Sequence, residues 1–297
     1  MAGFKRGISK PGMMEALAEL ATKESWWRDV LLDTSLVIGV RDDYLNVYWR
    51  GQSLFKVEMK RGKIVAATHP KYLLNPDLSG QVSLDPDTGG FALSAESALI
   101  QTYQPGETLG KLKRAANLFA SDEKIGVHTI ATSNANVVDV EIAFPAGSGG
   151  QSVPRIDIAS FDEAGDGVKL VFWEAKVLGN PELGVKGKKN VVKQIGTYVS
   201  LLSEHATDIL SSYTLIAQNL RSFRDMSGGV RNFAPSIDKV AQGAKLALAN
   251  PADVKLLVYG FNADQRDGLW QRLLQDLEGE LPAGGIIARG DAASIRL

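Results

Sequence analysis

The feature that most limits the fold is the hydrophobic period, which changes twice along the chain from helical spacing to strict alternation. Residues 11–32 have apolar side chains at helical spacing, and short segments rich in β-branched or aromatic residues follow. The turns between these segments carry Asp42-Asp43, Gly51-Gln52 and Arg61-Gly62. We therefore expect a helical region and then a β-meander, followed by a loop over the Pro-, Gly- and Asp-rich residues 75–90. The expected strands are 36–40, 45–49, 54–59 and 64–67.

The second half repeats this change of period. Three segments alternate between apolar and polar residues, and a tight turn at Asp166-Gly167 joins the last two of them. This arrangement predicts an antiparallel meander. One later helix has Val191, Ile195, Val199 and Leu202 as its expected core stripe. The pattern favours a mixed α/β domain with helices on both faces of a sheet. The expected elements are helices 107–119 and 121–133, strands 137–144, 155–161 and 168–175, helices 190–204 and 208–225, strand 254–260, helix 265–277 and strand 286–288.

Composition excludes several classes of site. The 297 residues include no cysteine, which removes disulfides, cysteine zinc sites, iron–sulfur clusters and thiol nucleophiles. The three histidines are far apart and match no zinc motif. The net charge is −1, so any binding of nucleic acid needs a local basic patch. No apolar run reaches the ~20 residues that span a bilayer, and we expect a cytoplasmic protein with no membrane partner.

One acidic and basic constellation has a context that chance does not explain. An acid followed two residues later by lysine occurs four times, but only Glu174-Ala-Lys176 ends an apolar strand. Alternation puts Glu174 and Lys176 on one face of that strand. Asp157 lies between apolar neighbours on the preceding strand, and the hairpin can place it beside Glu174. Two neighbouring carboxylates repel each other, and a divalent cation relieves that repulsion.

The helix that follows completes a resemblance. Gln194 and Tyr198 are four residues apart and share a helical face. Asp157, Glu174-x-Lys176 and Gln194-xxx-Tyr198 together resemble the PD-(D/E)XK nuclease superfamily, in particular its RecB-like and lambda-exonuclease-like branch. The resemblance implies a restriction-endonuclease-like core, a mixed sheet with an antiparallel meander flanked by helices, over residues 105–297. Residues 1–104 would form a separate region, a helix plus a β-meander, of unknown role. Ile156 stands where the name motif has proline.

The resemblance also implies roles for these residues in a metal-dependent nuclease. Asp157 and Glu174 would hold Mg²⁺, which Mn²⁺ can replace, and Lys176 would act on the attacking water and the scissile phosphate. A further acid would complete the site, with Glu123 as the candidate and Glu141 as its competitor. Gln194 would hold a metal-bound water or a nucleotide, and Tyr198 would stack on a base or donate to a phosphate. The basic loop before the Gln194 helix would contact phosphates through Lys186, Lys188, Lys189 and Lys193.

The expected substrate is nucleic acid, with DNA favoured over RNA, in repair, restriction or phage defence. A homo-oligomer or a partner protein of a defence system is compatible with this expectation. Two alternatives remain open at this stage. One is a nucleic-acid-binding or scaffold protein of the same fold that does not cleave, and the other is a nuclease effector gated by the N-terminal region. Bland interpretations also remain open: Asp157 paired with Arg155, Glu174 and Lys176 as an edge-strand ion pair, and Trp26, Trp27 and Trp49 as packing residues.

Overall fold

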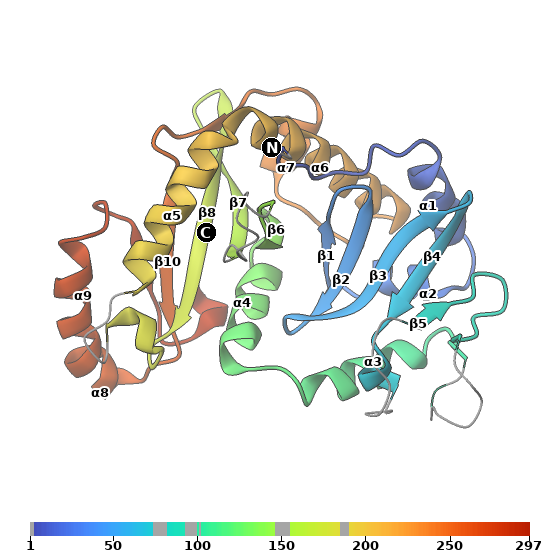
Figure 1. The fold of residues 1–297 in the computed structure, drawn as a ribbon, viewed down its shortest axis with the longest axis horizontal. Coiled ribbons are helices and arrows are strands. Elements are labelled where there is room, and N and C mark those ends of the chain that lie inside the picture. The colour runs from blue at the N-terminus through green and yellow to red at the C-terminus, as the bar shows by residue number, and fades with distance from the viewer. Residues whose placement is uncertain (1–2, 74–81, 93–99, 101, 146–154, 185–189) are drawn as a thin grey trace.

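The computed structural model describes residues 3–73, 82–92, 100, 102–145, 155–184 and 190–297. Its strands form two separate sheets, one from the N-terminal part of the chain and one from the C-terminal part. Figure 1 shows the two sheets side by side, with α4 and β6 between them. Among the described residues, no helix is both long and apolar enough to cross a membrane.

The N-terminal sheet is an antiparallel meander with the strand order β1-β2-β3-β4-β5. It confirms the four predicted strands, but a fifth strand lies inside the segment predicted as a loop. That strand, β5, pairs with β4 through three residues that contain no turn signal. The elements of this part are α1 (Met13–Ala21), α2 (Trp26–Leu32), β1 (Val37–Val40), β2 (Tyr44–Trp49), β3 (Gln52–Lys60), β4 (Lys63–Thr68), β5 (Val82–Leu84) and α3 (Thr108–Asn117).

The C-terminal sheet is mixed, with the strand order β11-β10-β8-β7-β6. Its strands β6, β7 and β8 are antiparallel, as predicted, whereas β10 runs parallel to β8 and β11 parallel to β10. A short strand, β9, pairs in parallel with the first half of β8. The elements of this part are α4 (Asp122–Ser133), β6 (Val137–Ile142), β7 (Ile156–Ala164), β8 (Gly167–Val177), α5 (Asn190–Glu204), α6 (Ala206–Met226), α7 (Pro235–Ala241), β9 (Leu246–Leu248), β10 (Val254–Tyr259), α8 (Ala263–Gln265), α9 (Gln271–Glu278) and β11 (Ile286–Ala288).

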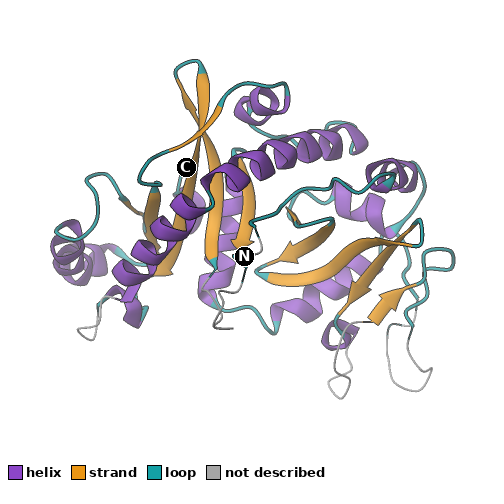
Figure 2. Cartoon of the chain, turned by 45° about the horizontal axis from the view of Figure 1, so that its top comes forward, coloured by secondary structure: helices purple, strands orange, loops and turns teal. Residues whose placement is uncertain are grey.

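Helices cover both faces of the C-terminal sheet, as Figure 2 shows. On one face, Val127 and Ile130 of α4 pack against Trp173 and Ala175 of β8. On the other face lie α5 and α6, and the ring of Phe172 meets the ring of Tyr213 at 5.8 Å. The alternation of β8 therefore turns Glu174 and Lys176 toward the face that α5 covers.

Two details differ from the sequence predictions. The buried stripe of α5 is Val191, Ile195, Tyr198 and Leu202, so Tyr198 takes the place predicted for Val199. At about 100° per residue, the observed stripe spans about 60° of the helix surface and the predicted stripe about 80°, so both lie on one face and packing against the sheet selects the narrower one. In addition, α7 and β9 were not predicted, because each is too short to show a period.

A buried ionic cluster joins the two sheets. Arg41 follows β1, and its Nη1 lies 2.6 Å from Oδ1 of Asp139 on β6. Arg6 from the N-terminal segment reaches Oδ2 of the same carboxylate at 3.0 Å. Arg41 also donates to the backbone oxygen of Val140 at 2.7 Å, and the Tyr213 hydroxyl donates to Asp139 at 3.4 Å. The N-terminal part is thus held against β6 by contacts from which water is excluded.

Candidate active site

The β7–β8 hairpin brings Asp157 and Glu174 together. Ile158 pairs with Trp173 in the antiparallel register, so Asp157 and Glu174 are the next facing residues beyond that pair. The Asp157 Oδ2 accepts a hydrogen bond of 2.8 Å from the backbone N–H of Ala175. This contact fixes the carboxylate at the end of β8, where the pairing with β7 ends.

Lys176 joins two carboxylates in the same place. Its Nζ lies 2.7 Å from Glu174 Oε1 and 2.8 Å from Glu182 Oε2. Glu174 is 1% exposed and Lys176 is 5% exposed. The pair is not on an edge strand, because β8 lies between β7 and β10. A buried ion pair in a central strand carries a large desolvation cost. The bland interpretation of Glu174 and Lys176 as a solvated edge-strand pair is therefore wrong.

Burial and mutual repulsion shift the pKa values of both acids upward. Burial is the main cause of the raised pKa of Asp157, and the charge of Glu174 adds to it. Burial also raises the pKa of Glu174 to about 7, against the opposing effect of Lys176, while Glu123 and Glu182 raise it further. Two neighbouring carboxylates are costly to ionise together, and a bound cation would offset that cost.

Two polar atoms at this point have no partner among the described residues. They are Oε2 of Glu174 and Oε1 of Gln194, both buried. Buried polar atoms in folded proteins are nearly always hydrogen-bonded, so each of these calls for a partner such as water or an ion. The Gln194 Nε2 donates to the Tyr198 hydroxyl at 2.8 Å, which leaves its carbonyl oxygen as the free group.

The tyrosine has a different environment from the one predicted. The Tyr198 side chain is 0% exposed, and its hydroxyl donates to the backbone oxygen of Arg155 at 2.8 Å. Burial raises its pKa, and the charge of Glu174 adds to the effect. A fully buried ring cannot stack on a base, so that part of the prediction is wrong. Tyr198 instead holds Gln194 and the start of β7 in place.

The two candidates for the further acid lie together with Asp157. Glu123 of α4, Glu141 of β6 and Asp157 all line one cavity of about 70 Å³. The Glu123 Oε2 accepts from Asn180 Nδ2 at 2.6 Å, whereas Glu141 lies 3.4 Å from Arg155 Nη1. The predicted alternative of an Asp157–Arg155 pair is therefore replaced by a Glu141–Arg155 pair.

The N-terminal part forms one wall of this cavity. Val37 and Tyr48 from its sheet and Gly51 from the β2–β3 turn line it opposite the three carboxylates. The structure of Glu141 is unusual, because its φ of 54° lies in the left-handed region that non-glycine residues seldom adopt. Arg41, which binds the oxygen of the preceding Val140, holds this part of β6. A contribution of residues before position 105 to the site was not predicted from the sequence.

The donor set suits one kind of metal. Among the described residues, no group of three or more acidic or histidine side chains is placed to hold an ion. Mg²⁺ is commonly bound through one or two carboxylates together with waters and substrate phosphates, so Asp157 and Glu174 are sufficient. The unpartnered Oε2 of Glu174 fits this requirement. Glu123 is the better candidate for a third contact, because it accepts from the amide of Asn180, whereas Glu141 already pairs with the cation Arg155.

Sequence reasoning missed Glu182 and Asn180. Glu182 lies in the short 3₁₀ turn Pro181–Leu183, and Asn180 is the N-cap of this turn, with a side chain that accepts from the Glu182 N–H at 2.9 Å. The Asn-Pro pair was the available signal, because it marks a turn directly after the Lys176 strand. This turn contacts both sides of the site, because Asn180 donates to Glu123 and Glu182 pairs with Lys176.

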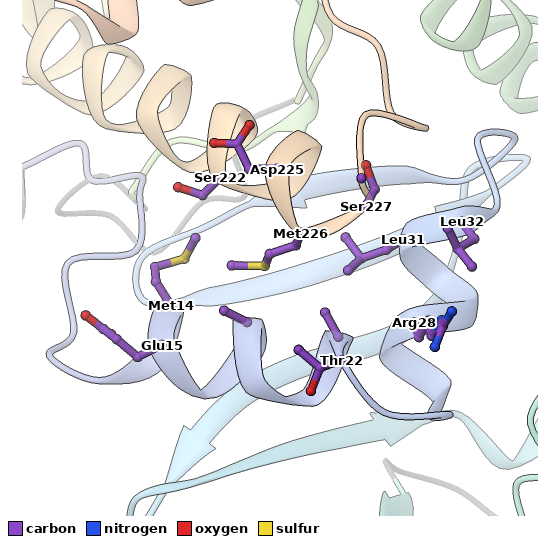
Figure 3. A pocket seen from close by; sticks show the side chains of 13 residues that line it. Met14, Glu15, Thr22, Arg28, Leu31, Leu32, Ser222, Asp225, Met226 and Ser227 are labelled. Atoms are coloured by element: carbon purple, nitrogen blue, oxygen red, sulfur yellow. The ribbon is translucent and has the colours of Figure 1, made fainter.

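The predicted basic loop is only partly described. Lys186, Lys188 and Lys189 lie outside the described residues, and Lys193 is exposed in the first turn of α5. A wider cavity of about 850 Å³ lies elsewhere, between α1, α2 and the end of α6 (Figure 3). Its lining is largely aliphatic and short polar side chains, and it shares no residue with the carboxylate cavity.

Comparison with known proteins adds no relative to this geometry: no family model, no curated protein and no solved structure matches the chain.

Proposed function

We propose that the chain is a metal-dependent nuclease that hydrolyses phosphodiester bonds of nucleic acid, with DNA as the preferred substrate. The observation that carries the proposal is the buried Asp157, Glu174 and Lys176 cluster, in which Glu174 Oε2 has no partner among the described residues. A protein that only needed stability would gain from replacing such a cluster by apolar side chains. The presence of this cluster is better explained by a chemical role.

The order of elements supports the same proposal. The elements α4, β6, β7, β8 and α5 follow one another, and β10 comes after α6, α7 and β9. This order is compatible with the restriction-endonuclease-like core that the resemblance implies. Asp157, Glu174 and Lys176 come from the meander and Gln194 from the helix behind it, as that core requires. The preference for DNA rests on the resemblance alone.

In this proposal each residue has one task. Asp157 and Glu174 would hold Mg²⁺, for which Mn²⁺ can substitute, and Glu123 would be the further acid of the site. The bound ion would polarise the phosphate and lower the pKa of the attacking water. Lys176 contributes an ammonium beside the developing negative charge, and the Gln194 oxygen accepts a hydrogen bond from the attacking water. Glu182 positions Lys176 through its ion pair.

The test is a panel of labelled linear duplex DNA, circular DNA, single-stranded DNA and RNA, each incubated with Mg²⁺, Mn²⁺ or EDTA. We expect cleavage of a DNA substrate with either metal and none with EDTA. Asp157→Asn should remove the activity, whereas Asp166→Asn in the exposed β7–β8 turn should keep it. Absence of cleavage for the wild type across the whole panel would refute the proposal.

A further inference from the structure

Basic and aromatic side chains gather beside the cavity on the N-terminal part of the chain. They come from the β2–β3 turn, the 3₁₀ turn after β4, α3 and the start of α4. We call them the basic-aromatic surface: Trp49, Arg50, Lys71, Lys113, Phe119 and Lys124.

Ring contacts hold three of the four cations of this surface in place, namely Arg50, Lys71 and Lys113. The Lys113 Nζ lies 4.1 Å from the Trp49 ring centroid, and the Arg50 guanidinium lies 5.2 Å from it. The Lys71 Nζ lies 4.6 Å from the centroid of Phe119, whose side chain is 45% exposed. Cation–π contacts of this kind fix long side chains and so reduce the entropy that they lose when they bind an anion.

The surface runs into the candidate active site. A Cβ added to Gly51, next to Arg50, would lie 2.7 Å from the Cβ of Lys124, so the turn packs closely against the start of α4. Gly51 and Lys124 also line the cavity that holds Glu123 and Asp157. A chain of phosphates lying across the surface would therefore arrive at the carboxylates.

The charges of the surface are poorly compensated. Within the part of the chain that the structure describes, Arg50, Lys71 and Lys124 have no ion pair with a carboxylate, whereas Lys113 pairs with Asp33 at 2.7 Å. Burial lowers the pKa of Lys71, and the nearby charge of Lys124 lowers it further. A bound polyanion would reduce the repulsion between these neighbouring cations, so binding it is favourable.

We propose that the basic-aromatic surface binds the phosphodiester backbone of nucleic acid and guides it to the cavity lined by Glu123, Glu141 and Asp157. The surface lies outside the residues that the resemblance covers for catalysis, and it shares no residue with the basic segment 186–193. An acidic peptide would also meet the positive charge. Nucleic acid is favoured because the surface continues into a cavity with the chemistry for a phosphodiester. The proposal rests on the proposed function and gives the N-terminal part a role in substrate binding.

The experiment measures binding separately from cleavage. A short fluorescein-labelled DNA duplex is titrated with protein in Ca²⁺ and in EDTA, and anisotropy is followed over a range of salt concentrations. The test variant combines Arg50→Asn, Lys71→Gln and Lys124→Gln, in which asparagine tolerates the left-handed backbone of position 50. The control combines Lys23→Gln, Lys60→Gln and Lys63→Gln, three exposed lysines that already pair with Glu19, Glu58 and Asp87.

The triple variant should bind DNA more weakly, with a salt slope smaller by about 2 to 3, because each lost phosphate contact reduces it by about 0.9. The control variant should keep the wild-type affinity and slope. A wild type that does not bind DNA, or a triple variant with an unchanged slope, would overturn the inference. If the wild type cleaves DNA but the variant keeps an unchanged salt slope, the binding surface is wrong and the nuclease proposal still holds. Loss of binding in the variant of a protein that cleaves nothing leaves only the binding surface.

Discussion

At the scale of single residues, the site combines charges that the fold does not need. Asp157 has one hydrogen bond to the backbone and no cation in direct contact among the described residues, and its neighbour Glu174 is buried with a free oxygen. Alternation along β8 and a charge inside an apolar strand were enough to locate both acids and Lys176 from the sequence. Their partners Glu182 and Asn180 lie in an irregular turn, where no period indicates which side chain points inward.

The two acids predict a dependence of stability on pH in the absence of metal. The pKa of Glu174 rises from 4.5 to about 7 on folding, and that of Asp157 also rises. The folded state therefore keeps protons that the unfolded state has lost, so stability should fall as the pH rises from about 4.5 to about 7. For Glu174 alone the fall corresponds to about 3 kcal/mol at most.

Asp157→Asn should reduce this fall and stabilise the metal-free protein above that pH range by about 1 to 3 kcal/mol, because the amide oxygen still accepts from Ala175 N–H. Thermal unfolding in EDTA at several pH values measures both effects. Asp166→Asn, in the exposed turn, is the control and should follow the wild type. A variant less stable than the wild type at high pH would show that the Asp157 charge is structural.

Lys176 predicts a separation of binding from turnover. Lys176→Ala should leave the affinity for nucleic acid nearly unchanged and lower single-turnover cleavage about 100- to 1000-fold, because the ammonium acts on the transition state. Glu182→Gln should cause a smaller loss, since Glu174 still holds the ammonium at 2.7 Å. Equal cleavage by Lys176→Ala and the wild type would remove the lysine from the mechanism.

At the scale of elements, periodic segments were predicted well and short ones were not. The strands β7, β8 and β10 and the helices α5 and α6 have clear periods, and the structure confirms them. The three-residue strands β5 and β9 depend on pairing with β4 and β8, which their own sequences do not reveal. The position of Tyr198 in the buried stripe of α5 depends on the helix phase, which packing against the sheet determines.

The β2–β3 turn provides a test of contact between elements. Gly51 and Gly62 have φ values of 71° and 78°, so alanine strains both turns by a similar amount, about 1 to 2 kcal/mol. Only at Gly51 would the new Cβ clash with Lys124, whereas nothing lies within 4 Å of a Cβ at Gly62. Gly51→Ala should therefore lose more stability in urea unfolding and also lose cleavage activity. Equal effects of the two variants would mean that the turn does not support α4.

At the scale of the whole molecule, the C-terminal sheet supplies Asp157, Glu174 and Lys176, whereas both parts of the chain line the cavity beside Asp157. The cavity takes Tyr48 and Gly51 from the N-terminal part and its carboxylates from the C-terminal part. The sequence could not reveal this, because Arg41 and Asp139 are 98 residues apart and each is an ordinary charged residue when read alone. The N-terminal part is therefore expected to support the site directly.

Asp139→Ala should weaken this junction strongly. It leaves Arg6 and Arg41 buried without their carboxylate, a change that costs about 3 to 5 kcal/mol. Asp87→Ala, which breaks the exposed pair with Lys63, should change the free energy of unfolding far less, because water screens this pair. Urea unfolding followed by tryptophan fluorescence measures both. A small loss for Asp139→Ala would show that the two sheets do not depend on this cluster.

The central claim is that Asp157 and Glu174 together bind a divalent cation, and calorimetric titration with Mn²⁺ tests it most directly. The titration uses nucleic-acid-free protein at a pH above the value of about 7 for Glu174, where that acid is ionised. The wild type and Asp166→Asn should bind the ion, and Asp157→Asn should bind it at least about tenfold more weakly. Equal binding by Asp157→Asn and the wild type, or no binding by the wild type, would contradict the account.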